Sequence, residues 1–158
     1  MRILGIDPGL ARVGYGIIGL VKGQRQMLDC GIICTDPGRN EGQRMVEIAT
    51  DLRRLIRRWQ PDLAAVEKFF FYRSSTTIGV VQARGVVMMT LARFCVPALE
   101  FPPMQVKLAL VGSGHAEKDA VLSAVMQELQ LEEPPRPDDT ADALAVALTG
   151  WLYSGSIS

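Results

Sequence analysis

Three segments near the amino terminus show the apolar or alternating pattern of β-strands. They cover residues 2–7, 13–20 and 27–34. Turn-forming residues separate them, with Asp-Pro-Gly at 7–9 and Val-Lys-Gly-Gln at 21–24. Because the connections are short, we expect these strands to form an antiparallel meander.

Helical periodicity begins after the third strand. Apolar residues from Met45 to Trp59 recur at spacings of three and four, and arginines occupy the other faces, which is the pattern of an amphipathic helix. Pro61 ends that helix. Residues 63–67 are then apolar up to Glu67, as expected for a fourth strand that is buried in the sheet.

The rest of the chain alternates helices and strands. Residues 76–95 are apolar nearly all round a helix, which suits burial against the sheet on one side and a further partner on the other, a second subunit being one candidate. We expect a fifth strand over 96–101 and further helices over 103–110, 117–130 and 139–153. A meander followed by crossover helices predicts an α/β protein with a mixed five-stranded sheet and helices on both faces.

Length and composition are those of an ordinary globular domain. With 158 residues, 48% of them hydrophobic and 22% charged, the chain can bury a core without metal or disulfide staples. We expect one domain over residues 1–153 and a short disordered tail over 154–158. The amino-terminal residues lack a signal-peptide pattern, and no apolar run reaches the about 20 residues of a membrane span. We therefore expect a cytoplasmic protein with no membrane partner, whose three cysteines, Cys30, Cys34 and Cys95, are reduced and half-buried.

The formal net charge is zero, but the charges are unevenly distributed. Residues 1–116 hold 15 Lys and Arg against 9 Asp and Glu, a net charge of +6, whereas residues 117–158 hold 2 against 8, a net charge of −6. A basic body beside an acidic segment is suited to binding phosphate with one part. A chance distribution explains the totals equally well until motifs are considered.

Four acidic residues occupy positions that are expected to meet. Asp7 ends the first strand and Glu67 ends the fourth, so the two carboxylates lie close if these strands are neighbours. Asp139 and Asp142 are three residues apart and share one face of the last helix. Each acid alone is explained as readily by a turn or a helix cap, but together they predict one acidic cluster at an edge of the sheet.

An acidic cluster of this kind needs cations, because carboxylates held close together repel one another. Oxygen ligands favour magnesium, with manganese as a substitute, and the single histidine, His115, is better explained as an exposed turn residue than as a zinc ligand. Two such cations are the arrangement that hydrolyses phosphodiester bonds: one activates the attacking water and the other stabilises the leaving 3' oxygen. The cluster therefore predicts a nuclease with two Mg²⁺ per subunit.

Aromatic residues are concentrated directly after Glu67. Phe69, Phe70, Phe71 and Tyr72 stand in four consecutive positions and Arg73 follows. A loop beside a scissile phosphate can stack an aromatic ring on an unpaired base, at about 1–3 kcal/mol per base. A buried extension of the strand is the alternative interpretation of this segment.

Several short motifs occur in a fixed order along the chain. They are Gly-Ile-Asp-Pro-Gly at 5–9, Gly-Tyr-Gly at 14–16, Gln-Ala-Arg-Gly at 82–85, Pro-Met-Gln-Val-Lys at 103–107, Ala-Glu-Lys at 116–118 and Asp-Thr-Ala-Asp-Ala-Leu-Ala at 139–145. The set resembles the RuvC family of crossover junction endodeoxyribonucleases over residues 2–152. The resemblance implies a ribonuclease H-like fold, a homodimer and magnesium-dependent resolution of Holliday junctions, that is, four-way DNA junctions. The family acts in homologous recombination and DNA repair by paired symmetric nicks that leave 5'-phosphate and 3'-hydroxyl ends, and the resemblance also implies RuvA and RuvB as partners.

The resemblance assigns roles to individual residues. Asp7, Glu67, Asp139 and Asp142 match the metal-binding acids of the family, in which some members carry histidine at the position of Asp139. Asp138 stays outside that set as a helix cap or an outer charge. Phe70 matches the phenylalanine that stacks at the junction, with Phe69 and Arg73 beside it as further DNA-binding residues. Lys107 and Lys118 are placed near the active site, where they contact phosphates, although without the resemblance they would be taken for surface lysines.

Two other functions remain open on the sequence. The loop at residues 5–9 also resembles the first phosphate loop of the actin-like ATPase group, which includes phosphotransferases, but the chain has one domain where that group needs two. A catalytically inert junction-binding protein would keep the basic surface and the aromatic segment, although the four retained acids speak against it.

Overall fold

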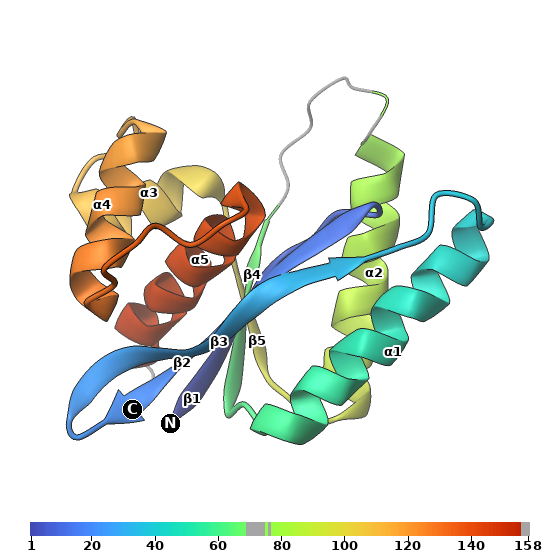
Figure 1. Ribbon diagram of the computed structural model, residues 1–158, viewed down its shortest axis with the longest axis horizontal. Coiled ribbons are helices and arrows are strands. Elements are labelled where there is room, and N and C mark those ends of the chain that lie inside the picture. Colours follow the sequence, from blue (N-terminus) through green and yellow to red (C-terminus); the bar gives the residue numbers. More distant parts are fainter. Residues whose placement is uncertain (69–74, 76, 156–158) are drawn as a thin grey trace.

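The computed structural model describes residues 1–68, 75 and 77–155. Five strands form one mixed sheet in the order β3-β2-β1-β4-β5 (Figure 1). The strands are β1 (Arg2–Asp7), β2 (Arg12–Val21), β3 (Gln24–Cys34), β4 (Leu63–Glu67) and β5 (Ala98–Phe101). The first three pair antiparallel, and β4 is parallel to both β1 and β5. The predicted meander and the mixed five-stranded sheet are confirmed.

Two of the predicted strands are longer in the structure because the turn between them is tight. Only Lys22 and Gly23 separate β2 from β3, and both have positive φ, 52° and 81°. Two such residues form the hairpin turn whose twist matches that of the strands. Pairing therefore continues up to Val21 and Gln24, which the sequence pattern had assigned to the turn.

The helices agree with the prediction except at their ends. They are α1 (Glu41–Trp59), α2 (Thr77–Arg93), α3 (Pro103–Val111), α4 (Lys118–Leu129) and α5 (Asp138–Ser154). The first begins four residues before its apolar pattern because Asn40 caps it, in a reciprocal pair of hydrogen bonds with Gln43. The fifth strand is shorter than predicted. The amide N–H groups of Cys95 and Val96 bond back to carbonyls of α2, so strand pairing begins only at Ala98.

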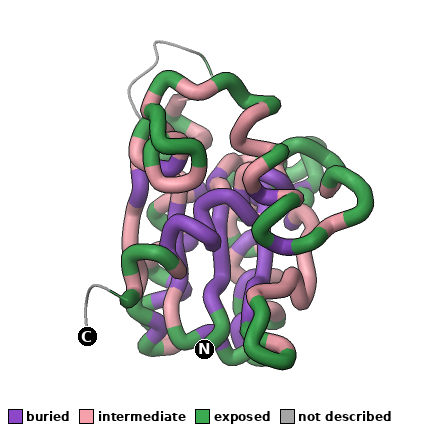
Figure 2. The backbone as a smooth tube through the Cα atoms, turned by 90° about the vertical axis from the view of Figure 1, so that its left-hand side faces the viewer, coloured by how far each residue is buried: buried purple, intermediate pink, exposed green. Residues whose placement is uncertain are grey.

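Alternation along the strands sorts the side chains into two cores. Leu4, Ile6 and Val66 face α1 and α2, whereas Ile3 and Ala65 face α3, α4 and α5. Helices therefore cover both faces of the sheet (Figure 1). The buried residues gather in the middle of the molecule and the exposed ones on its outer turns (Figure 2).

Helix α5 packs against the sheet at backbone distance. A Cβ atom added at Gly5 would lie 2.0 Å from the carbonyl oxygen of Ala143, and one at Gly14 would lie 2.2 Å from that of Asp139. Both distances are far shorter than any real contact, so only glycine fits these two positions of β1 and β2. Two glycines thus hold the first turns of α5 against the strand that ends in Asp7.

Two further expectations meet the structure only in part. Cys30 is half-buried as expected, but Cys34 and Cys95 are exposed, and all three thiols are free. The last helix extends to Ser154, the first residue of the expected tail, and residues 156–158 lie outside the described part. Among the residues described, no helix is both long and apolar enough to span a membrane.

Candidate active site

The carboxylates of Asp7 and Glu67 meet at the ends of two adjacent strands. Strand β1 is parallel to β4 with Ile6 opposite Val66. Asp7 and Glu67, each the next residue along its strand, are therefore also opposite each other. Because both acids are one residue beyond positions that face α1 and α2, they point to the α5 side of the sheet. A hydrogen bond between them, which requires that one carboxyl group be protonated, is among the causes that raise the pKa of Asp7. The condition on which the sequence argument depended, that these two strands are neighbours, is therefore met.

Helix α5 adds two more acids to this point. Asp139 and Asp142 lie in its first turns, and Asp7, Asp139 and Asp142 each offer a carboxylate oxygen such that the three oxygens lie within 4.8 Å of one another. All three side chains are half-buried. The arrangement follows from the glycine contacts described above, because these fix where the start of α5 crosses β1 and β2.

The negative charges in this cluster shift its proton equilibria. Burial, the hydrogen bond with Glu67 and the charges of Glu67, Asp142 and Asp139 together raise the pKa of Asp7 to about 10. Burial and the neighbouring acids raise the pKa of Asp142 to about 6, although Lys118 opposes the shift. Carboxylates that resist ionisation in each other's presence, with oxygen as their only donor atom, suit a hard divalent cation that balances their charge.

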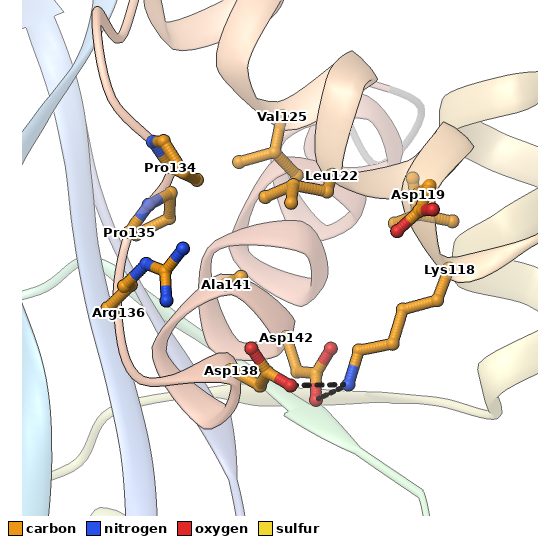
Figure 3. A pocket seen from close by; sticks show the side chains of 11 residues that line it. Lys118, Asp119, Leu122, Val125, Pro134, Pro135, Arg136, Asp138, Ala141 and Asp142 are labelled. Carbon is orange, nitrogen blue, oxygen red and sulfur yellow. Dashed lines mark ion pairs between the residues drawn. The ribbon is translucent and has the colours of Figure 1, made fainter.

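Both lysines of the sequence prediction lie beside the acids. Lys107 on α3 and Lys118 at the start of α4 line one cavity of about 180 Å³ together with Glu67 and Asp142. The Nζ atom of Lys118 is 3.7 Å from Asp142 and 3.6 Å from Asp138 (Figure 3). The coulombic attraction of Asp142, and then that of Asp138, raises the pKa of Lys118. An ammonium group is therefore kept at the rim of the acidic cluster.

Asp138 is not a helix cap, so that part of its prediction is wrong. The cap position of α5 is Pro137, which has no side-chain acceptor. Asp138 is the first residue of the helix itself, its side chain is 83% exposed, and it pairs with Lys118. It is therefore an outer charge that pairs with Lys118 and whose negative charge also helps to raise the pKa of Asp142, which agrees with the second interpretation.

The sequence reasoning missed one charged residue of the site. Arg12 begins β2, and its Nε atom lies 3.5 Å from a carboxylate oxygen of Asp139. The only available signal was its spacing of two from Gly14, which puts both residues on the α5 face of the strand. His115 is exposed in its turn, as predicted. Phe69, Phe70 and Arg73 lie outside the described residues.

Comparison with known proteins shows which protein family this chain is similar to. A family model described as "Crossover junction endodeoxyribonuclease RuvC" matches residues 3–150. The proteins of that description from Prochlorococcus marinus (strain MIT 9313) and Parasynechococcus marenigrum (strain WH8102) are 78% and 80% identical over 152 residues, which are 96% of this chain and 99% of each relative.

Solved structures agree with the sequence comparison. The structure of Thermus thermophilus RuvC superposes with a TM-score of 0.90 at 36% identity, over 99% of this chain and 96% of that one. The structure of T. thermophilus RuvC in complex with a Holliday junction substrate gives a TM-score of 0.91 at 36% identity, over 98% and 94% of the two chains. The ribonuclease H-like fold is therefore established, and the phosphotransferase interpretation is not supported. The chain belongs to the RuvC family of crossover junction endodeoxyribonucleases.

Proposed function

We propose that this protein resolves Holliday junctions by metal-dependent hydrolysis of two opposed phosphodiester bonds, leaving 5'-phosphate and 3'-hydroxyl ends, in homologous recombination and DNA repair. The observation that carries the proposal is the meeting of Asp7, Glu67, Asp139 and Asp142 at one edge of the sheet. Four acids from two strands and a helix, supplied by segments more than 130 residues apart in the chain, have no structural need to meet. A metal-dependent nuclease, in contrast, requires that its acidic ligands meet at one point.

The four acids would hold two Mg²⁺ ions per subunit, with Mn²⁺ as a substitute. Bound there, the cations would supply an activated water and would stabilise the leaving 3' oxygen. The protein's own contribution is to fix the oxygen ligands before metal arrives, through strand pairing and the packing of α5. Lys107 and Lys118 stand at the rim, where their charges attract the scissile phosphate and offset the charge that develops on it.

The aromatic segment after Glu67 would recognise the unpaired bases of a junction. Phe70 would stack on a base, with Phe69 and Arg73 supplying further contacts to DNA. The short distance along the chain from Glu67 supports this assignment, because an unstacked base then lies near the cleaved bond.

A homodimer would deliver the paired nicks, since each subunit has one acidic cluster. Helix α2 supports this assembly, because its outward residues Ile78, Val81 and Met89 are 69%, 53% and 52% exposed. Gly85 lies on the same helical face, and no atom lies within 4 Å of the position that a Cβ atom would take there. A second helix can therefore approach closely at this point. Residues 1–153 would form one nuclease domain that works on DNA in the cytoplasm, with RuvA and RuvB as partners.

The decisive experiment uses a synthetic four-way junction labelled on each strand. With Mg²⁺ or Mn²⁺ we expect symmetric nicks whose ends can be religated, and we expect Asp7→Asn and Glu67→Gln to retain binding but lose cleavage. Asp51→Asn, an exposed acid paired with Arg54 on α1, is the matched control and should cleave normally. Junction binding without metal-dependent nicking by the wild type would favour an inert binding protein and refute the proposal.

A further inference from the structure

Arg12 adds a positive charge to the acidic cluster through its ion pair with Asp139. It stands two residues before Gly14 on the same face of β2, and Gly14 meets the backbone of Asp139. The ion pair between Arg12 and Asp139 follows from that close approach. Its Nε to Oδ2 distance is 3.5 Å, and the two side chains are 56% and 33% exposed. A guanidinium at this distance and exposure is held only weakly, so it can be exchanged for another partner.

A groove leads away from this ion pair along the start of α5. It has a volume of about 660 Å³ and is lined by Arg12, Lys118, Arg136, Asp138 and Asp139. Arg136, on the loop that precedes α5, lies on the far side of a neighbouring pocket from Lys118 (Figure 3). Among the described residues Arg136 has no salt bridge, and Asp138 is already paired with Lys118. Asp139 is therefore the acid that pairs with Arg12 in this groove and competes with any anion for its guanidinium.

We propose that Arg12 couples metal binding to DNA binding. While no metal is bound, it is the counter-ion of Asp139. Once a divalent cation takes that carboxylate, Arg12 is released to bind a backbone phosphate of the DNA strand lying in the groove, with Arg136 as a second phosphate contact. The inference rests on the proposed function, because it requires both a metal at Asp139 and DNA at the site.

The charges decide the direction of this coupling. In the metal-free protein the groove carries three cations and two acids, and both acids are occupied by ion pairs. A divalent cation that replaces Arg12 at Asp139 would leave the guanidinium unpaired in a groove whose other cationic residues are Lys118 and Arg136. Arg12 thus opposes metal binding in the free protein and favours DNA binding in the metal-loaded one, so metal and DNA strengthen each other's binding.

The test compares Arg12→Ala with the wild type in two binding measurements. Calorimetric titration with Mn²⁺ in the absence of DNA should show an affinity increase of about two- to fivefold in the variant, the range expected when an exposed ion pair no longer competes. Junction binding, measured by anisotropy in Ca²⁺ with the DNA checked for integrity, should weaken. The slope of log affinity against log salt concentration should become shallower by about one, as expected when one phosphate contact is lost.

Two further variants make the result specific. Arg54→Ala removes an exposed arginine from an ion pair on the other face of the sheet and should leave both measurements unchanged. Arg12→Lys keeps the charge and should restore the salt slope. Equal unfolding midpoints of the variants and the wild type establish that the fold is intact.

The inference is overturned if Arg12→Ala changes only one of the two affinities, or neither. It is also overturned if Mn²⁺ binds the variant more weakly than the wild type. Arg12 would then help metal binding by holding the Asp139 carboxylate in position, and would not compete with the metal for it. Absence of Mn²⁺ binding by the wild type itself would refute the proposed metal site, and this inference with it. The wild-type titration therefore separates the two failures.

Discussion

Replacing Asp7 by asparagine should stabilise the metal-free protein increasingly as the pH rises from 5 to 8, even though it removes a residue of the active site. The pKa of Asp7 is raised from its ordinary value of 3.8 to about 10 by burial and by the neighbouring carboxylates. Between these two values the folded protein holds a proton that the unfolded chain releases. Stability attributable to Asp7 therefore falls as the pH rises through this window, whereas asparagine does not titrate.

The size of the effect follows from the proton that Asp7 holds in the folded protein. Keeping this proton lowers the free energy of unfolding by about 1.4 kcal/mol for each pH unit above 3.8. From pH 5 to pH 8 the cost grows by about 4 kcal/mol. The advantage of Asp7→Asn in free energy of unfolding should therefore grow by up to about 4 kcal/mol over this interval, and we expect about 2–4 kcal/mol after local relaxation. At about 2–4 °C per kcal/mol for a domain of this size, the melting temperature of the variant should gain roughly 5–10 °C on the wild type.

The assay is thermal and urea unfolding in EDTA at pH 5, 6, 7 and 8, with Asp51→Asn as the control that should track the wild type. Asp142, which titrates near pH 6, is present in both proteins and largely cancels in the difference. Adding Mn²⁺ should raise the melting temperature of the wild type and leave that of Asp7→Asn almost unchanged. A stability difference that stays constant from pH 5 to pH 8 would refute the reasoning.

Three further predictions concern the glycine contacts, the lysine rim and the core. Gly14→Ala forces the backbone of α5 away from β2, and we expect a loss of about 1–3 kcal/mol in stability with at least a tenfold weaker Mn²⁺ affinity by calorimetry. Gly155→Ala, at the far end of α5, where an added Cβ atom meets nothing within 4 Å, should change neither. Lys118→Ala removes the charge that lowers the pKa of Asp142, so the acid limb of the pH–rate profile for junction cleavage should move to higher pH, and an unmoved limb would contradict this role. Leu52→Ala opens a cavity at a fully buried position and should cost about 2–5 kcal/mol in urea unfolding, while single-turnover cleavage per folded molecule stays at the wild-type rate.

Much of the fold could be predicted because local rules agree with one another in this chain. Alternation located the strands and the 3.6-residue period located the helices. Together these patterns were sufficient to place Asp7 and Glu67 at the ends of strands, whereas the pairing of those two strands is seen only in the structure. The ends of elements were less certain, because they depend on single hydrogen bonds. The cap at Asn40 extends α1 beyond its apolar residues, and the backbone bond from Val96 to Leu91 delays β5.

The remaining parts of the site could not be predicted because they depend on distances between segments far apart in the chain. Arg12 reaches Asp139 only because α5 crosses β2 at Gly14, and no local pattern encodes that crossing. The same limit applies to Asp138, whose partner Lys118 comes from another helix. Residue type and spacing predict which groups can act, whereas the contact between helix and sheet determines which of them meet.

The close fit of α5 on Gly5 and Gly14 has a consequence for how this site tolerates change during evolution. The acids are aligned by main-chain atoms, so the identity of most outward side chains on α5 can vary without moving the ligands. The strictest limits on side-chain volume instead fall on two positions that carry no functional group at all. A saturation library selected for junction cleavage should therefore tolerate as few substitutions at these two glycines as at the carboxylates. A designer who wishes to change the metal ligands can vary residues on α5, but must keep the glycines of β1 and β2 against which the helix packs.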